Sequence, residues 1–99
     1  MKKVFISQPM RGKTEDEILT ERNRIIEEIQ ASIGDHEILD TYFDDFGPGA
    51  KPLQYLAKSL WMLADADCAY FAPGWHDARG CRIEHEAAVA YGLGIIYEE

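Results

Sequence analysis

Apolar positions along this chain fall into two alternating patterns. Short continuous apolar runs, typical of strands buried on both faces, occupy residues 4–6, 68–72 and 95–97. A further strand is expected over residues 37–43, although its alternation is poor. Between these runs, apolar residues recur at helical spacing over residues 14–34, 52–65 and 80–91. The pattern therefore predicts four strands that alternate with three helices.

The ends of the predicted helices carry recognisable signals. Thr14, with Glu17 three residues later, forms a capping box, and Gly34 closes the first helix. Pro52 suits the first turn of the second helix. The inward face of the last helix is expected to carry Ile83, Ala87, Ala90 and Tyr91.

One basic residue, Arg22, falls on the apolar stripe of the first helix. Either its aliphatic part lies along the core while the guanidinium reaches solvent, or the side chain faces a ligand. The spacing leaves both interpretations open.

The order of the elements predicts the architecture. Parallel strands joined by right-handed helical crossovers form a three-layer α/β/α sandwich of the flavodoxin-like or Rossmann-like kind, here as a single domain over residues 1–99. We expect a sheet of about four strands in the order 2-1-3-4, with the switch point between the first and third strands. The loops after these strands, residues 7–13 and 73–80, should then face each other across one cleft.

The charge balance narrows the class of ligand. Ten basic and eighteen acidic residues give a net charge of −8 at pH 7, which disfavours duplex nucleic acid because such binding depends on neutralising phosphates. A small anionic ligand is still compatible with this charge if the site supplies local donors. Neither a signal peptide nor a long apolar segment is present, so we expect a cytoplasmic protein with no membrane partner.

The cysteines and histidines show no metal-binding pattern. Cys68 and Cys81 lack metal-type or redox-type spacing, and Cys68 is expected in the core. Four possible metal ligands lie close together along the chain: His76, Asp77, Glu84 and His85. Their spacing matches neither His-x-x-x-His nor His-Glu-x-x-His, so we expect no metal and no cofactor.

The loop over residues 7–13 is a candidate anion site. Arg11 and Lys13 flank Gly12 just before a helix N-terminus, where exposed N–H groups and the helix dipole favour an anion and an arginine can bind a phosphate through two hydrogen bonds. The alternative is a solvated turn with two basic residues. Because neither a Walker pattern nor Gly-x-Gly-x-x-Gly is present, a nucleoside triphosphate or dinucleotide is not expected.

Two carboxylates, Asp77 and Glu84, are expected near the start of the last helix, at the ligand end of the sheet. Helical spacing puts Glu84 and Glu86 both at the margin of the buried face. Glu84 lies closer to the helix start, where the dipole favours its ionised form. Two carboxylates that flank one cleft can catalyse cleavage of a glycosidic bond. One attacks or stabilises the anomeric carbon, and the other transfers the proton. Alternatively, Glu84 is a solvated or capping residue.

Aromatic residues in the loops or at strand ends offer faces on which a base could stack: Tyr42, Phe43, Phe46 and Trp75. Local packing is the alternative for each of them. For Tyr42 and Phe43 it is the better interpretation.

Three stretches of the sequence match a known superfamily in order. They are residues 5–12 (Phe-Ile-Ser-Gln-Pro-Met-Arg-Gly), Ala66-Asp67 before the third predicted strand, and residues 74–92, which include Gly74-Trp75 and Arg79-Gly80-Cys81-Arg82-Ile83-Glu84. On these motifs the chain resembles the nucleoside 2-deoxyribosyltransferase-like superfamily, especially its short phage and bacterial members. The resemblance spans nearly the whole chain. Its most specific part is the spacing of Gly80, Glu84 and Gly92.

The resemblance implies a flavodoxin-like fold and cleavage of the N-glycosidic bond of a nucleoside or nucleotide. It implies Glu84 as the nucleophile on the anomeric carbon, Asp77 as the group that assists proton transfer at the base, and a loop after the first strand that holds the 5′-phosphate. It also implies a homodimer. Together with the aromatic argument above, the residues expected to bind substrate or phosphate are Ser7, Gln8, Pro9, Met10, Arg11, Gly12, Ser59, Trp75 and Gly80.

One departure separates this chain from the characterised enzymes of that superfamily. They carry an aspartate on the second helix, where this chain has Ser59, which cannot supply a carboxylate to position or protonate the leaving base. The chain also ends at Glu99, without the C-terminal extension from which the transferases take sugar-binding groups. We therefore expect a nucleoside or nucleoside-monophosphate N-glycosidase or deoxyribosyltransferase-like enzyme. The alternative is a catalytically inactive domain that binds a nucleotide-derived ligand.

Overall fold

Strands and helices alternate through the computed structural model, which describes residues 1–39 and 51–98. The elements are β1 (Lys2–Ser7), α1 (Glu15–Ile33), β2 (His36–Ile38), α2 (Pro52–Leu63), β3 (Cys68–Phe71), the 3-10 turn η1 (Trp75–Asp77), α3 (Arg79–Ala90) and β4 (Gly94–Tyr97). Their order confirms the predicted alternation. The turn η1 was not predicted from the sequence pattern.

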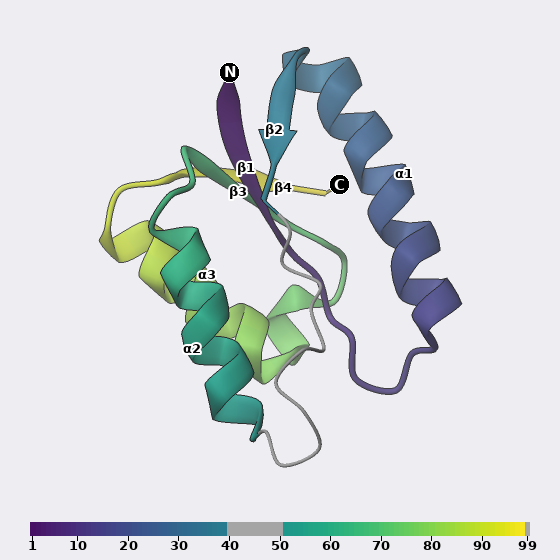
Figure 1. The fold of residues 1–99 in the computed structure, drawn as a ribbon, viewed down its shortest axis with the longest axis vertical. Coiled ribbons are helices and arrows are strands. Elements are labelled where there is room, and N and C mark those ends of the chain that lie inside the picture. Colours follow the sequence, from purple (N-terminus) through teal and green to yellow (C-terminus); the bar gives the residue numbers. More distant parts are fainter. Residues whose placement is uncertain (40–50, 99) are drawn as a thin grey trace.

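The four strands are parallel and lie in the order β2-β1-β3-β4 (Figure 1). Val4 of β1 is aligned with Ile38 of β2 on one side and with Cys68 of β3 on the other. Helix α1 covers one face of the sheet, and α2 and α3 cover the opposite face (Figure 1). The predicted three-layer fold and strand order are therefore confirmed, and the switch point lies between β1 and β3.

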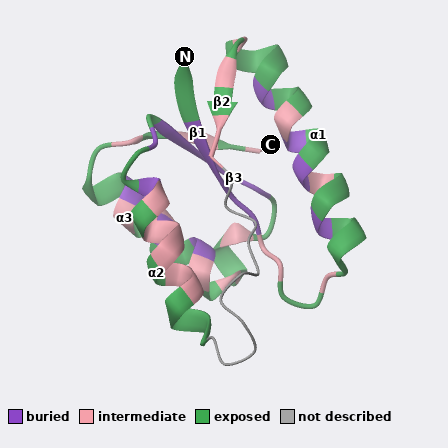
Figure 2. Ribbon diagram, in the orientation of Figure 1, coloured by how far each residue is buried: buried purple, intermediate pink, exposed green. Residues whose placement is uncertain are grey.

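Successive side chains of β1 point to opposite faces of the sheet, so the apolar core has one half on each face. The strands at the centre of the sheet are coloured as buried in Figure 2. The half on the α1 side consists of Val4, Ile6, Ile25, Ile29, Cys68, Tyr70 and Ala72. The half on the α2 and α3 side consists of Phe5, Leu63, Ala66, Ala69, Phe71 and Ala88. Because Ser7 follows Phe5 by two residues, it shares the second face, and the end of β1 presents its hydroxyl toward α3.

Helix α1 begins at the predicted capping box. The backbone N–H of Glu17 donates to Thr14 Oγ1 at 3.2 Å, and the Thr14 N–H donates to the Glu17 carboxylate at 3.1 Å. Gly34 ends the helix with a φ of 78°, which few other residues adopt without strain. The hydrogen bond accepted by an N-cap residue such as Thr14 stabilises a helix by about 1 kcal/mol.

Arg22 is buried, so the expectation that its guanidinium reaches solvent is wrong. Its Nη2 donates to the carbonyl oxygen of Leu39 at 3.1 Å. The side chain therefore ties α1 to the segment that follows β2.

Strand β2 is shorter than the sequence predicts. It covers His36–Ile38, whereas a strand was expected over residues 37–43, of which residues 40–43 lie outside the described part. The hydrogen bonding between this segment and β1 continues for one residue beyond β2, because the Leu39 N–H donates to the Val4 carbonyl at 2.9 Å. Tyr42, Phe43 and Phe46, named above as possible stacking residues, also lie outside the described part.

The buried face of α3 differs from the prediction. Of the four residues expected on the inward face, Ile83, Ala90 and Tyr91 are exposed, and only Ala87 packs partly buried against the core. The buried residues are Cys81, Glu84 and Ala88. Both sets have helical spacing, so periodicity does not choose between them. Helix α3 packs against α2 as well as the sheet, and Ala88 belongs to the core between them. The contacts of α3 with α2 and the sheet, rather than its own periodicity, therefore determine which face of the helix is buried.

The outer face of α2 carries exposed apolar side chains. Leu53 is 72% exposed and Trp61 is 79% exposed.

Among the described helices, none combines the length and apolar character needed to cross a bilayer. The homodimer stays a prediction.

Candidate active site

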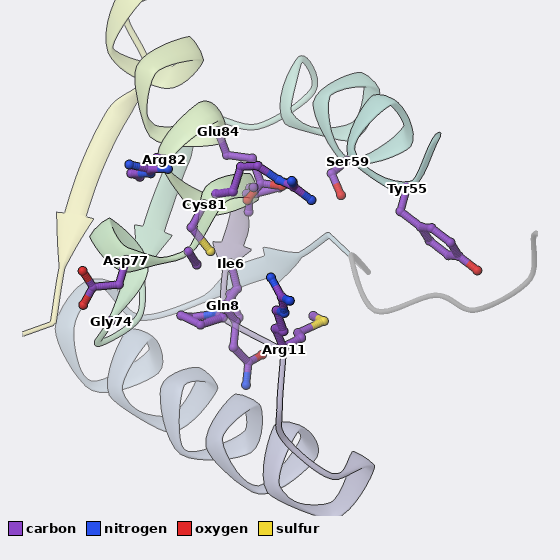
Figure 3. Close-up of a pocket in the computed structure, with 16 residues that line it drawn as sticks. Ile6, Gln8, Arg11, Tyr55, Ser59, Gly74, Asp77, Cys81, Arg82 and Glu84 are labelled. Atoms are coloured by element: carbon purple, nitrogen blue, oxygen red, sulfur yellow. The ribbon is translucent and has the colours of Figure 1, made fainter. Parts of the chain in front are cut away.

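A pocket of about 730 Å³ opens at the carboxyl ends of β1 and β3 (Figure 3). Its walls come from the β1–α1 loop, from α2, and from the segment that leads through η1 into α3. This volume lies in the usual range for small-molecule sites. Both loops that were expected to face one cleft, residues 7–13 and 73–80, supply wall residues.

Glu84 is the buried carboxylate of this pocket. Its side chain is only 8% exposed, and Ser7 Oγ donates to Glu84 Oε1 at 2.7 Å. The contact follows from the fold, because Ser7 ends β1 on the face that α3 covers. Glu86, which helical spacing could not separate from Glu84, is exposed. Tertiary packing therefore selects Glu84 as the carboxylate that faces the ligand end of the sheet.

Burial raises the pKa of Glu84 to about 7. The Ser7 hydroxyl, and with a weaker effect the Ser59 hydroxyl, lower the pKa and offset part of this rise. This direction is opposite to the sequence expectation that the helix dipole would favour the ionised form, because desolvation outweighs the dipole here. Near neutral pH the protonated and ionised forms of Glu84 are thus both populated.

The contact between Ser7 and Glu84 leads to a prediction. Replacing Ser7 by alanine removes a hydroxyl that stabilises the ionised carboxylate, so the pKa of Glu84 should rise from about 7 to about 8. A pH titration of the Glu84 side-chain carboxyl by carbon NMR measures this change. Ser59→Ala is the matched control and should cause a smaller rise. An unchanged midpoint in Ser7→Ala would contradict the assigned hydrogen bond.

Cys81 lies one turn before Glu84 and lines the same pocket. Burial raises the pKa of the Cys81 thiol to about 11, with a further upward contribution from the Glu84 charge and a downward one from the Ser7 hydroxyl. The thiol is therefore neutral at physiological pH and is a poor nucleophile. Both cysteines of the chain are free. Cys81 was not expected in the site, although its spacing of three from Glu84 on a helix indicates that the two side chains share a face.

Three arginines line the pocket: Arg11, Arg79 and Arg82. Among the ion pairs between described residues, none involves these three side chains. The first turn of α3 contains no acidic residue, and Ala78 provides no side-chain cap. Arginines at a helix N-terminus oppose the helix dipole, so this end of α3 concentrates positive charge in a chain of net charge −8. Of the three, only Arg11 was expected in the site from the sequence.

The loop after β1 contributes four consecutive wall residues, Gln8, Pro9, Met10 and Arg11. Ser7 lies behind the wall, where it holds Glu84. Gly12 does not line the pocket; with a φ of 80° it forms the turn in which the Lys13 N–H donates to the Met10 carbonyl at 3.2 Å. Lys13 turns toward α1, where its Nζ lies 3.4 Å from Glu21 Oε1.

Helix α2 contributes Tyr55 and Ser59, which are four residues apart and so share one helical face. Ser59 was expected in the site and is found on the pocket wall. Tyr55 was not proposed from the sequence, although its spacing from Ser59 could have indicated it. Gly80, at the start of α3, also lines the pocket.

Asp77 lies at the rim of the pocket rather than beside Glu84. Its side chain is 84% exposed, and its Oδ2 is 3.6 Å from Nε2 of His76. The carboxylate points away from Glu84 (Figure 3). The structure therefore does not bring together the two carboxylates that were expected to flank one cleft.

Trp75 is not among the residues that line the pocket. Its ring stacks on His85, with 4.2 Å between ring centroids, and lies 5.4 Å from the ring of Phe71. His85 Nε2 in turn is 2.6 Å from the hydroxyl of Tyr97. The local-packing interpretation accounts for Trp75, because η1 turns the ring onto α3 and the sheet.

No set of three histidine, cysteine, aspartate or glutamate side chains within residues 1–39 and 51–98 is arranged to hold a metal ion. His85 is held by aromatic neighbours, and His76 lies at the exposed rim beside Asp77. The chemistry available in and around the pocket is therefore that of the buried Glu84 carboxylate, the hydroxyls of Ser7, Tyr55 and Ser59, a neutral thiol and three guanidinium groups.

Comparison with known proteins places nearly the whole chain in one family. A family model described as "Domain of unknown function (DUF4406)" matches residues 2–97. No match was found among curated proteins. The description of the family names no activity, so the chemistry of the pocket has to indicate one.

Proposed function

The chain belongs to the DUF4406 family, and we propose that it cleaves the N-glycosidic bond of a nucleoside or nucleoside monophosphate with Glu84 as nucleophile. The observation that carries this proposal is the buried Glu84 carboxylate, held by Ser7 Oγ at 2.7 Å within a pocket of about 730 Å³. The resemblance of the motifs around Ser7 and Glu84 to the nucleoside 2-deoxyribosyltransferase-like superfamily supports it.

The reaction has two steps. The ionised Glu84 carboxylate attacks the anomeric carbon, the bond from that carbon to the base breaks, and its electron pair leaves with the base, which takes up a proton. Water, or a second base in a transferase reaction, then displaces Glu84 from the glycosyl ester. The Ser7 hydroxyl orients the carboxylate before attack. Because Asp77 points away from Glu84, solvent is the proton source for the leaving base.

The arginines of the pocket favour a phosphorylated substrate. Arg11 approaches from the β1–α1 loop, and Arg79 and Arg82 approach from the start of α3. A guanidinium binds phosphate oxygens through two parallel hydrogen bonds. Their positive charge also offsets the repulsion that a chain of net charge −8 exerts on an anionic substrate. A nucleoside 5′-monophosphate is therefore the preferred substrate class.

Release of free base tests this proposal. Purified protein is incubated with a panel of ribonucleosides, 2′-deoxyribonucleosides and their 5′-monophosphates, and free base is measured by chromatography. We expect at least one monophosphate to be cleaved, at a kcat/KM at least about tenfold above that of its nucleoside, because a charge-assisted hydrogen bond contributes about 1.5–3 kcal/mol. Absence of base release across the whole panel would overturn the enzymatic proposal.

A catalytically inactive nucleotide-binding domain is the second candidate function. It is favoured by the lack of a proton donor beside Glu84, since Asp77 lies at the exposed rim and Ser59 replaces a carboxylate. Titration calorimetry with the same panel separates the two candidates. Binding without any base release supports the inactive domain, and the absence of a binding signal for every compound rejects it.

A further inference from the structure

The walls of the pocket differ in charge from one side to the other. The loop after β1 and the start of α3 supply three guanidinium groups, those of Arg11, Arg79 and Arg82. Helix α2 supplies two uncharged side chains, Tyr55 and Ser59. A nucleotide is divided in the same way, because its phosphate is charged and its base is a flat, uncharged ring system. The phosphate of such a ligand is therefore expected on the arginine side and the base beside α2.

The geometry of α2 relates Tyr55 to the buried carboxylate. The hydroxyl of Ser59 lies close enough to Glu84 to lower the pKa of its carboxyl group. Tyr55 precedes Ser59 by four residues, so their Cβ atoms are about 5–6 Å apart on one face of the helix. Both side chains project from the same side of α2 (Figure 3). A base that is bonded to the anomeric carbon at Glu84 and directed past Ser59 therefore reaches the ring of Tyr55.

Tyr55 is also the accessible aromatic ring of the pocket wall. Among the described residues that line the pocket there is one other aromatic side chain, Phe5, which is 1% exposed and belongs to the core. Tyr55 is partly exposed. Trp75, which was expected from the sequence to stack on a base, lies outside the pocket wall and stacks on His85. Tyr55 thus presents the surface on which any of the bases can stack, since every base has a π face.

We propose that the base of the bound nucleotide stacks on the ring of Tyr55, so that α2 forms the base-binding side of the pocket and the arginines form its phosphate-binding side. The proposal rests on the proposed function in taking the ligand to be a nucleotide, and it applies equally to an enzyme and to an inactive binding domain. It gives Tyr55 the stacking role that was expected of Trp75. Stacking requires the ring and not the phenolic hydroxyl, so Tyr55→Phe should bind nucleotides as wild type does.

The test compares ligands that have a base with one that lacks it, in wild-type protein and in Tyr55→Leu. Dissociation constants are measured by NMR titration for AMP, GMP, CMP and UMP, and for ribose 5-phosphate. We expect the affinity of the tightest-binding nucleotide to fall at least about tenfold in Tyr55→Leu, the scale of base stacking on an aromatic side chain. The affinity for ribose 5-phosphate should stay within about twofold of wild type, because this ligand has no base to stack.

The resonances of the ligand report on stacking directly. A proton held over the face of an aromatic ring is shielded by the ring current, so the base protons of the bound nucleotide should shift upfield in wild type and in Tyr55→Phe. Tyr55→Leu should abolish this shift. Trp61→Leu is the matched control, because Trp61 lies on the same helix, is 79% exposed and does not line the pocket. It should leave the shift unchanged and the affinities within about twofold of wild type.

The outcomes separate this inference from the proposed function. A loss of nucleotide affinity in Tyr55→Leu with ribose 5-phosphate binding retained supports the inference. An equal loss for both kinds of ligand, wild-type affinity in Tyr55→Leu, or an upfield shift that persists in that variant overturns it, and the shift decides where ribose 5-phosphate binds too weakly to compare. Base release is recorded in the same samples. Binding that depends on Tyr55 without base release supports this inference while it rejects the enzymatic proposal.

Discussion

Replacing Glu84 by glutamine is expected to reduce base release from a susceptible nucleotide by at least about a thousandfold, the scale on which loss of a nucleophile acts. Glutamine keeps the size of the side chain and can still accept a hydrogen bond from Ser7 Oγ, which lies 2.7 Å from Glu84 Oε1 in the wild-type protein. It cannot form a glycosyl ester. The measurement is kcat/KM by chromatography of the free base, accompanied by mass spectrometry of the wild-type protein to detect a glycosyl group on Glu84.

Glu86→Gln is the matched control, because Glu86 lies on the same helix but is exposed. Its activity should stay within about twofold of wild type, as for most surface changes away from the site. If Glu84→Gln retained wild-type activity, the Glu84 carboxylate would not be the nucleophile of the reaction. The retained activity would then have to be assigned to another group or to a contaminating enzyme.

The same substitution should stabilise the fold above neutral pH. The folded-state pKa of Glu84 is about 7, against 4.5 for a free glutamate. A carboxyl group whose pKa is raised by folding contributes its full stability below the lower value, and that contribution is lost as pH rises through the higher one. Relative to wild type, Glu84→Gln should therefore gain about 3 kcal/mol of unfolding free energy between pH 4.5 and pH 8.

Urea unfolding at a series of pH values measures this gain, since the midpoint at constant slope reports on stability. Other titrating groups, such as Glu98, whose pKa is lowered mainly by its hydrogen bond to Arg24, affect both proteins alike and cancel in the difference. Glu86→Gln again serves as the control, with no trend expected. A difference between Glu84→Gln and wild type that is constant with pH would show that Glu84 titrates normally.

The fold of the described residues could be predicted from local patterns because each pattern corresponds to a physical constraint. The continuous apolar run at residues 4–6 predicts a strand covered on both faces, and in the structure Val4 and Phe5 are buried on opposite faces. The capping box of Thr14 and Glu17 fixes where α1 begins. Parallel strands joined by helices then allow few topologies.

The candidate site was only partly predictable. The two loops that line the pocket follow from the strand order, since the ends of neighbouring parallel strands meet at one edge of the sheet. Sequence spacing could not separate Glu84 from Glu86, because both stood at the margin of one helical face. It also paired Asp77 with Glu84, whereas the carboxylate of Asp77 points away from the pocket at the exposed rim.

By itself, the sequence determined the order of the elements, the parallel sheet and the loops that meet at its carboxyl edge, because these depend on residues close together in the chain. Tertiary structure decided the chemistry. The burial that raises the pKa of Glu84 requires β1, α2 and α3 to surround its side chain, and the Gln8 amide is held by hydrogen bonds from its nitrogen to Ile18 and Glu21 of α1. Desolvation and hydrogen-bond satisfaction are set by contacts across the fold, which spacing along a single element does not encode.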